Sequence, residues 1–211
     1  MTVMANPLTM FDVKGQVALI TGASGAFGMV AARILAGAGC KLVLAAGNQA
    51  ALDEIAEECR ALGSEVMALN QRPSDEAACQ SLIDEAVACF GQLDILVVAS
   101  GMNKVALIND MAPETFTDVM DANVTQSWLL ARAAAGQMKA QGQGGKIVLV
   151  SSARGLLGHP AGYTAYCASK GGGGWHHQIA WLRIGAHRDH CKCHCPHCVP
   201  LTFDGLDVRR Q

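Results

Sequence analysis

Short apolar runs alternate with longer amphipathic stretches along residues 15–170. The apolar runs have the length of buried strands, which we predict at Val17–Ile20, Leu42–Ala45, Glu65–Ala68, Ile95–Val98 and Ile147–Val150. The amphipathic stretches are rich in Ala and predict helices at Phe27–Ala36, Gln49–Leu62, Asp75–Phe90, Pro113–Asp121 and Val124–Met138. This alternation predicts an α/β fold, a doubly wound sheet of five parallel strands covered on both faces.

Glycine-rich breaks follow two of the predicted helices. Gly37–Gly39 and Gly142–Gly145 stand where a left-handed residue commonly closes the last helical turn. We therefore interpret them as element boundaries inside one domain and not as linkers.

The composition is that of a globular protein, with 51% hydrophobic and 16% charged residues. The 16 Lys and Arg are balanced by 18 Asp and Glu, so the chain has no basic excess and we expect no nucleic-acid partner. No apolar run approaches the roughly 20 residues of a membrane helix, and the N-terminus lacks the basic and apolar segments of a signal peptide. We therefore expect no membrane partner and a cytoplasmic location.

The first chemical signal is the sequence TGASGAFG at residues 21–28, directly after the first predicted strand and at the start of a helix. Glycines at such a turn let the backbone approach a pyrophosphate, and the helix N-terminus offers free N–H groups and a favourable dipole. The alternative is a tight turn without a ligand. The position between strand and helix favours a dinucleotide-binding turn.

The second signal is the sequence YCASK at residues 166–170, preceded by Ser151 and Ser152 at the end of the fifth predicted strand. Residues four apart share one face of a helix, which places Lys170 beside Tyr166. An ammonium group next to a phenol favours the phenolate, so Tyr166 would transfer a proton near neutral pH. Taken alone, the pair also fits an ordinary amphipathic helix.

Together these motifs resemble the short-chain dehydrogenase/reductase family over roughly Val13 to Gly172. The resemblance implies a Rossmann-like fold and an NAD(P)-dependent oxidoreductase that interconverts a secondary alcohol and a ketone. It implies that Ser152 polarises the substrate oxygen, Tyr166 transfers the proton, Lys170 binds the nicotinamide ribose and Asn123 carries a proton-relay water. Ser151 is then a strand-end hydroxyl, and Asn123 by itself also fits a helix cap.

The same resemblance implies a set of cofactor-binding residues: Gly22, Ser24, Phe27, Gly28, Gly101, Tyr166 and Lys170. The chain departs from the family pattern at Ala26, where a methyl replaces a glycine hydrogen, and at residues 98–101, where the family's NNAG reads VASG and two amides are lost. An acidic residue expected after the third strand is absent from residues 70–73. The second strand ends in Ala45, Ala46, Gly47 and Asn48. This segment has neither an acid that would bind a ribose 2′-hydroxyl nor an Arg that would bind a 2′-phosphate, so both NAD and NADP stay open as the cofactor.

The last fifth of the chain differs in kind, because residues 171–211 hold four Cys and six His. One interpretation is a zinc site, since Cys and His are the ligands that zinc prefers. The alternating spacing of Cys191, Cys193, Cys195 and Cys198 lacks the paired arrangement of known zinc motifs, and we predict no metal ligands. The glycine run 171–174 predicts that the helix carrying Tyr166 and Lys170 ends there.

The genetic code offers a second interpretation of this tail. When the codons are translated from their second base, residues 189–200 permit ITVNAIAPTVFR and residues from Gly173 permit VDGITKSL, both similar to the segments that the family has at these places. One extra base in the glycine codons would produce this pattern. We therefore predict a core at residues 1–172 and an out-of-frame, poorly ordered tail at residues 173–211.

A tail of this kind predicts a sheet truncated to about five strands, with the fifth strand as an exposed edge. The resemblance implies a homo-oligomer, but part of the helices that form its contacts would be missing here. Three functions therefore stay open: the oxidoreductase acting on a small alcohol or ketone, an inactive nucleotide-binding remnant, and a zinc-binding protein.

Overall fold

The computed structural model describes residues 11–171 and, as a strand, residues 190–194. All five predicted strands are present, as β1 (Val17–Thr21), β2 (Lys41–Ala45), β3 (Val66–Leu69), β4 (Ile95–Val98) and β5 (Lys146–Val150). The predicted helices are also present, as α1 (Ala26–Gly37), α2 (Gln49–Ala61), α3 (Glu76–Phe90), α4 (Pro113–Met120) and α5 (Gln126–Ala140). The helical and strand periodicities therefore located each element correctly.

The strands form one parallel sheet in the order β3-β2-β1-β4-β5-β6. The chain moves outward from β1 to β3, then returns to place β4 on the other side of β1. The strand order therefore reverses between β1 and β4, and open α/β sheets bind their ligands at the carboxyl ends of the strands at such a point. The Rossmann-like α/β class predicted from the sequence is confirmed.

The sixth strand, β6 (His190–His194), corrects one expectation. It pairs in parallel with β5 over five residues, from Lys146 opposite His190 to Val150 opposite His194. The fifth strand is therefore not an open edge. Strands pair through main-chain N–H and C=O groups, so a segment rich in Cys and His is able to occupy this position.

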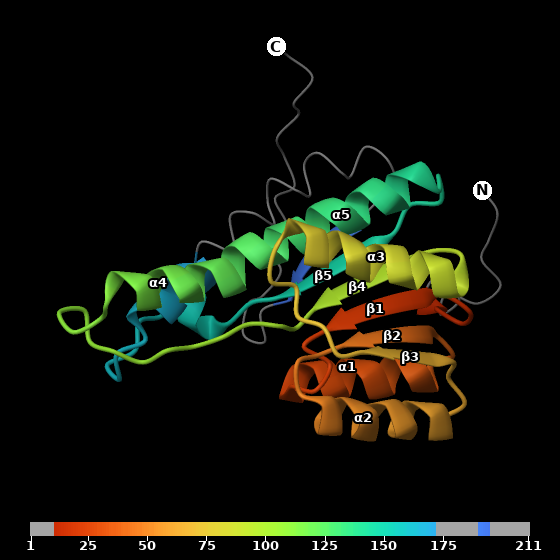
Figure 1. The fold of residues 1–211 in the computed structure, drawn as a ribbon, viewed down its shortest axis with the longest axis horizontal. Coiled ribbons are helices and arrows are strands. Elements are labelled where there is room, and N and C mark those ends of the chain that lie inside the picture. Colours follow the sequence, from red (N-terminus) through yellow and green to blue (C-terminus); the bar gives the residue numbers. More distant parts are fainter. Residues whose placement is uncertain (1–10, 172–189, 195–211) are drawn as a thin grey trace, which may run out of the picture.

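Helices cover the sheet on both faces (Figure 1). On one face, α3 and α5 contribute Leu82, Ile83 and Leu130 to a buried cluster that includes Leu19 of β1. On the other face, α1 and α2 supply the apolar side chains of a second cluster around Ile20. Successive strand residues thus serve opposite cores, as the side-chain alternation of a strand requires.

The glycine breaks are confirmed as helix ends. Gly39 and Gly142 follow α1 and α5 with φ angles of +84° and +76°, which residues with a Cβ seldom adopt. Among the helices of the described part, none is long and apolar enough to cross a membrane.

Candidate active site

The glycine turn predicted to bind a dinucleotide connects β1 to α1. Gly22 has a φ of +68°, and a Cβ on it would lie 2.6 Å from the amide nitrogen of Ser100. A Cβ on Gly28 would overlap the carbonyl oxygen of Gly22 and lie 2.8 Å from the Cα of Ala23. The turn therefore needs glycine at both positions to pack against the end of β4 and against the first turn of α1.

The start of α1 is chemically suited to an anion. Gly25 occupies the N-cap position without a side-chain cap, and the first turn carries no acidic residue. Its free N–H groups and the helix dipole therefore face no competing negative charge from the helix itself. Ala26 is exposed at the first helical position, and Phe27 is 58% exposed, whereas Ser24 is half-buried. These features fit the pyrophosphate of a dinucleotide.

A hydroxyl pair joins the glycine turn to the loop after β4. The Oγ1 of the buried Thr21 lies 3.0 Å from the Oγ of Ser100, and the amide of Ala99 donates to the carbonyl of Thr21. These contacts hold the ends of β1 and β4 together although the sequence lacks the two amides of the family pattern. Ser100 thus supplies a polar contact at this junction.

Asn123 does not act as a helix cap. It lies within a five-residue π-helical turn, Asp121–Thr125, between α4 and α5, and its side chain is only 4% exposed. Its Oδ1 accepts from the amide of Met102 at 2.8 Å, while its Nδ2 donates to the Met102 carbonyl at 2.8 Å and to Ser169 Oγ at 2.9 Å. Both amide protons and one lone pair of Oδ1 therefore tie the π turn to the loop after β4 and to the segment containing Tyr166.

Lys170 lies next to Tyr166, as the helical spacing predicts. Its Nζ is 5.8 Å from the centroid of the Tyr166 ring and donates to the carbonyl of Val150 at 2.9 Å. A Cβ on Gly101 would lie 3.8 Å from this Nζ and 2.7 Å from Asn123 Oδ1. The structure therefore brings Tyr166, Lys170, Asn123 and Gly101 together at the carboxyl edge of the sheet.

Ser152 follows β5 on the same edge. It caps a short 3-10 turn, Ala153–Gly155, and its Oγ accepts from the amide of Arg154 at 3.2 Å. Gly155 lets this turn pack on the helical residues 164–171, because a Cβ there would lie 2.6 Å from the carbonyl oxygen of Lys170. The Oγ of Ser151 donates to that same carbonyl at 3.5 Å. The Ser152 turn is thus fixed against the backbone of Lys170.

Ser169 is a site residue that sequence analysis did not single out. It is fully buried, donates to the carbonyl of Tyr166 at 2.8 Å and accepts from Asn123. It thereby links the proton-transfer candidate to the π turn. Its only signal in the sequence is its place between Tyr166 and Lys170.

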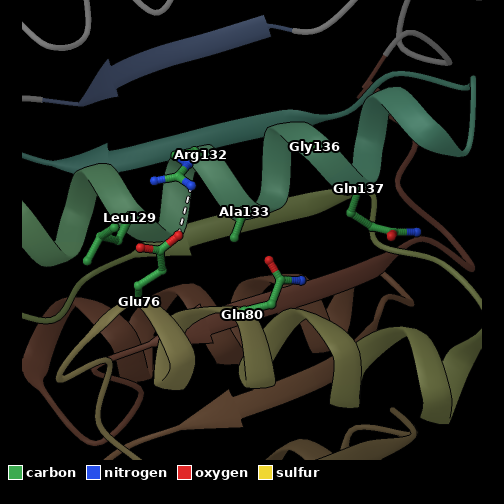
Figure 2. Close-up of a pocket in the computed structure, with 7 residues that line it drawn as sticks. All are labelled: Glu76, Gln80, Leu129, Arg132, Ala133, Gly136 and Gln137. Carbon is green, nitrogen blue, oxygen red and sulfur yellow. Dashed lines mark hydrogen bonds and ion pairs between the residues drawn. The ribbon is translucent and has the colours of Figure 1, made fainter.

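A surface groove lies between α3 and α5 (Figure 2). Glu76 and Arg132 form an ion pair of 2.8 Å across it, and none of the candidate residues lines it. Within residues 11–171, no cluster of three metal-ligating side chains occurs. Three predictions lie outside the described residues. They are the interpretation of the Cys and His side chains as zinc ligands, the end of the Tyr166 helix at the glycine run, and the poor order of most of the tail.

The sequence profile of the short chain dehydrogenase family matches residues 16–185. An uncharacterised oxidoreductase of Mycobacterium tuberculosis is 49% identical over 165 residues, which cover 78% of this chain and 60% of the relative. A hydroxynaphthalene reductase of Aspergillus fumigatus is 33% identical over 79% of this chain and 60% of its own length. The chain thus spans about 60% of the length of these curated relatives.

Solved structures give the same result. A short-chain type dehydrogenase/reductase from Mycobacterium marinum superposes with a TM-score of 0.85 at 30% identity, covering 88% of this chain and 76% of that one. A short chain dehydrogenase/reductase from Burkholderia phymatum in complex with NAD gives a TM-score of 0.83 at 30% identity, covering 88% and 66%. On the family profile, the relatives and the shared fold, the chain belongs to the short chain dehydrogenase family.

Proposed function

We propose that this chain is an NAD(P)-dependent oxidoreductase that interconverts a secondary alcohol and a ketone. The observation that supports this most strongly is the grouping of Tyr166, Lys170 and Asn123 beside the glycine turn. A hydride acceptor held at that turn would lie near the group that moves the proton. NAD-bound relatives with the same fold support the choice of a nicotinamide dinucleotide.

The roles of the residues follow from their chemistry. When bound, the nicotinamide supplies the acceptor or donor of a hydride. Tyr166 takes the hydroxyl proton of the alcohol in the oxidative direction and returns it to the carbonyl oxygen in the reductive one. Ser152 donates a hydrogen bond to the same oxygen, and Lys170 binds the cofactor ribose. In this assignment Tyr166 and Ser152 act on the substrate oxygen, and Lys170 acts on the ribose of the cofactor, all at the carboxyl edge of the sheet.

Asn123 acts as a positioning residue in this proposal. Its side-chain amide makes three hydrogen bonds to protein groups, so it has no remaining amide proton for a water. Its main-chain carbonyl accepts from Ser127 Oγ at 2.9 Å. A relay water at Asn123 would therefore have to donate to one of its oxygens and could not accept from its side-chain amide.

The test is cofactor reduction by the purified chain with a panel of secondary alcohols. The two adjacent serines supply a matched comparison: Ser152→Ala should lower kcat/KM about a hundredfold, whereas Ser151→Ala should change it little. Equal losses in the two variants would contradict the assignment of Ser152. Absence of dinucleotide binding by calorimetry would contradict the proposed function as a whole.

The second candidate is an inactive nucleotide-binding remnant, favoured by the family-like sequences that the shifted codons of residues 173–211 permit. This protein would bind the dinucleotide with the glycine turn but would oxidise no alcohol. Calorimetry and the turnover assay, performed on the same sample, separate the two functions.

We further propose that residues 1–172 form the dinucleotide-binding core and that residues 173–211 arise from a shift of reading frame. Support comes from the family-like sequences permitted by the shifted codons. An independent DNA read across the codons for Tyr166 to Gln211 tests this. We expect the read to show one base fewer in the glycine codons, or a shifted reading frame without a stop codon well beyond Gln211. The proposal would be refuted if the read confirmed the present frame and the shifted frame reached a stop codon soon after Gln211.

A further inference from the structure

The side chain of Arg72 lies directly against the carboxyl end of β2. Arg72 belongs to the loop after β3, and β3 pairs with β2, so the two strand ends are neighbours (Figure 1). A Cβ on Gly47 would overlap Arg72 Nε and would lie 2.7 Å from Cζ and 2.8 Å from Nη2. The guanidinium thus occupies the space that a side chain at Gly47 would fill.

The loop that carries Arg72 is well anchored. The side chain of Gln71 donates to the carbonyl of Ala78 at 3.2 Å, and the amide of Ser74 donates to the carbonyl of Arg72 at 2.8 Å. Pro73 is buried, and a proline restricts the residue before it to extended conformations. The backbone of Arg72 is therefore fixed before any ligand binds.

The charge of Arg72 is not neutralised by the described part of the protein. Within residues 11–171 its side chain forms no ion pair or hydrogen bond. The acids nearest in sequence have other partners, since Asp75 caps α3 through the amide of Ala78 and Glu76 pairs with Arg132. The end of β2 and the first turn of α2 contain no acid either. The position is positive and open to an anion.

We infer that Arg72 binds the 2′-phosphate of the adenosine ribose, and that the chain prefers NADP(H) to NAD(H). This rests on the proposed function, because in a doubly wound fold the adenosine ribose lies between the first glycine turn and the end of β2. An acid there would bind the free 2′-hydroxyl and repel a phosphate, whereas a guanidinium binds phosphate through two parallel hydrogen bonds. Gly47 is the position that makes room for it.

The test compares binding of NADP⁺ and NAD⁺ by calorimetry to the full chain and to two variants. The unmodified chain should bind NADP⁺ at least about tenfold more tightly than NAD⁺. Arg72→Gln should weaken NADP⁺ binding about tenfold to a hundredfold and change NAD⁺ binding less than about twofold. Gly47→Ala keeps every charge but displaces the guanidinium, so it should lower the preference for NADP⁺ as well.

Arg60→Gln is the matched control, because Arg60 lies at the opposite end of α2 and pairs with Glu57. It should leave both affinities unchanged. Equal affinities of the unmodified chain for the two dinucleotides, or equal weakening of both by Arg72→Gln, would overturn the inference while leaving the proposed function intact. Failure of the chain to bind either dinucleotide would instead refute the proposed function and the Arg72 assignment together.

Discussion

Replacing Asn123 by Asp tests whether the π turn is held by the donors of the Asn123 amide. The substitution preserves shape and keeps an acceptor for the Met102 amide, but it removes both bonds donated by Nδ2, to the Met102 carbonyl and to Ser169 Oγ. Each buried group left without its partner costs about 1–3 kcal/mol. Asn123→Asp should therefore lower the free energy of unfolding by about 2–6 kcal/mol.

Urea denaturation followed by circular dichroism measures this change, and Asn103→Asp is the matched control because Asn103 is exposed. The control should shift the free energy by less than about 0.5 kcal/mol. A thermal midpoint lowered by about 4–20 °C is expected for Asn123→Asp. Equal stability of the two variants would refute the view that these three hydrogen bonds hold the π turn.

Three further predictions concern glycines and thiols. Gly28→Ala should weaken dinucleotide binding by more than about tenfold in calorimetry, because its methyl would overlap the Gly22 carbonyl. Gly136→Ala, in the middle of α5 with nothing within 4 Å of the added methyl, should raise stability by about 1 kcal/mol in urea denaturation. Burial raises the pKa of the Cys40 and Cys79 thiols from 9.0 to about 11. The folded state therefore holds these two protons more tightly than the unfolded state does. The free energy of unfolding should be unaffected by the thiols below about pH 9 and should fall as the pH rises toward 11. The urea midpoint measured across that range checks this, and a flat profile would contradict it.

The sequence predicted the regular elements well because each has a clear apolar period. β1 is buried along all five residues and α2 is amphipathic, so both stand out from composition alone. Asn123 was harder, because a break between two helices and a continuous helix with a π turn differ only in backbone geometry. A polar residue such as Asn123 at the boundary between two predicted helices fits a helix cap equally well.

Other features depend on contacts between segments far apart in the sequence. The approach of Arg72 to Gly47 arises from the pairing of β3 with β2, and no local pattern at the end of β2 indicates it. The pairing of β6 with β5 depends on main-chain hydrogen bonds, which leave little trace in side-chain composition. The roles of Ser152, Tyr166 and Lys170 stay predictions.

The most direct test of the central claim is hydride transfer by Tyr166→Phe beside Tyr163→Phe. The two rings lie 6.0 Å apart between centroids, and Tyr163 stacks on His159. Because both variants lose a hydroxyl from the same region, comparing them distinguishes the loss of the Tyr166 hydroxyl from a general disturbance of the site. With a secondary alcohol that the unmodified chain oxidises, Tyr166→Phe should lower kcat at least about a hundredfold with cofactor binding retained, while Tyr163→Phe should keep most activity. Equal rates in the two variants would contradict the assignment of Tyr166 as the proton-transfer residue.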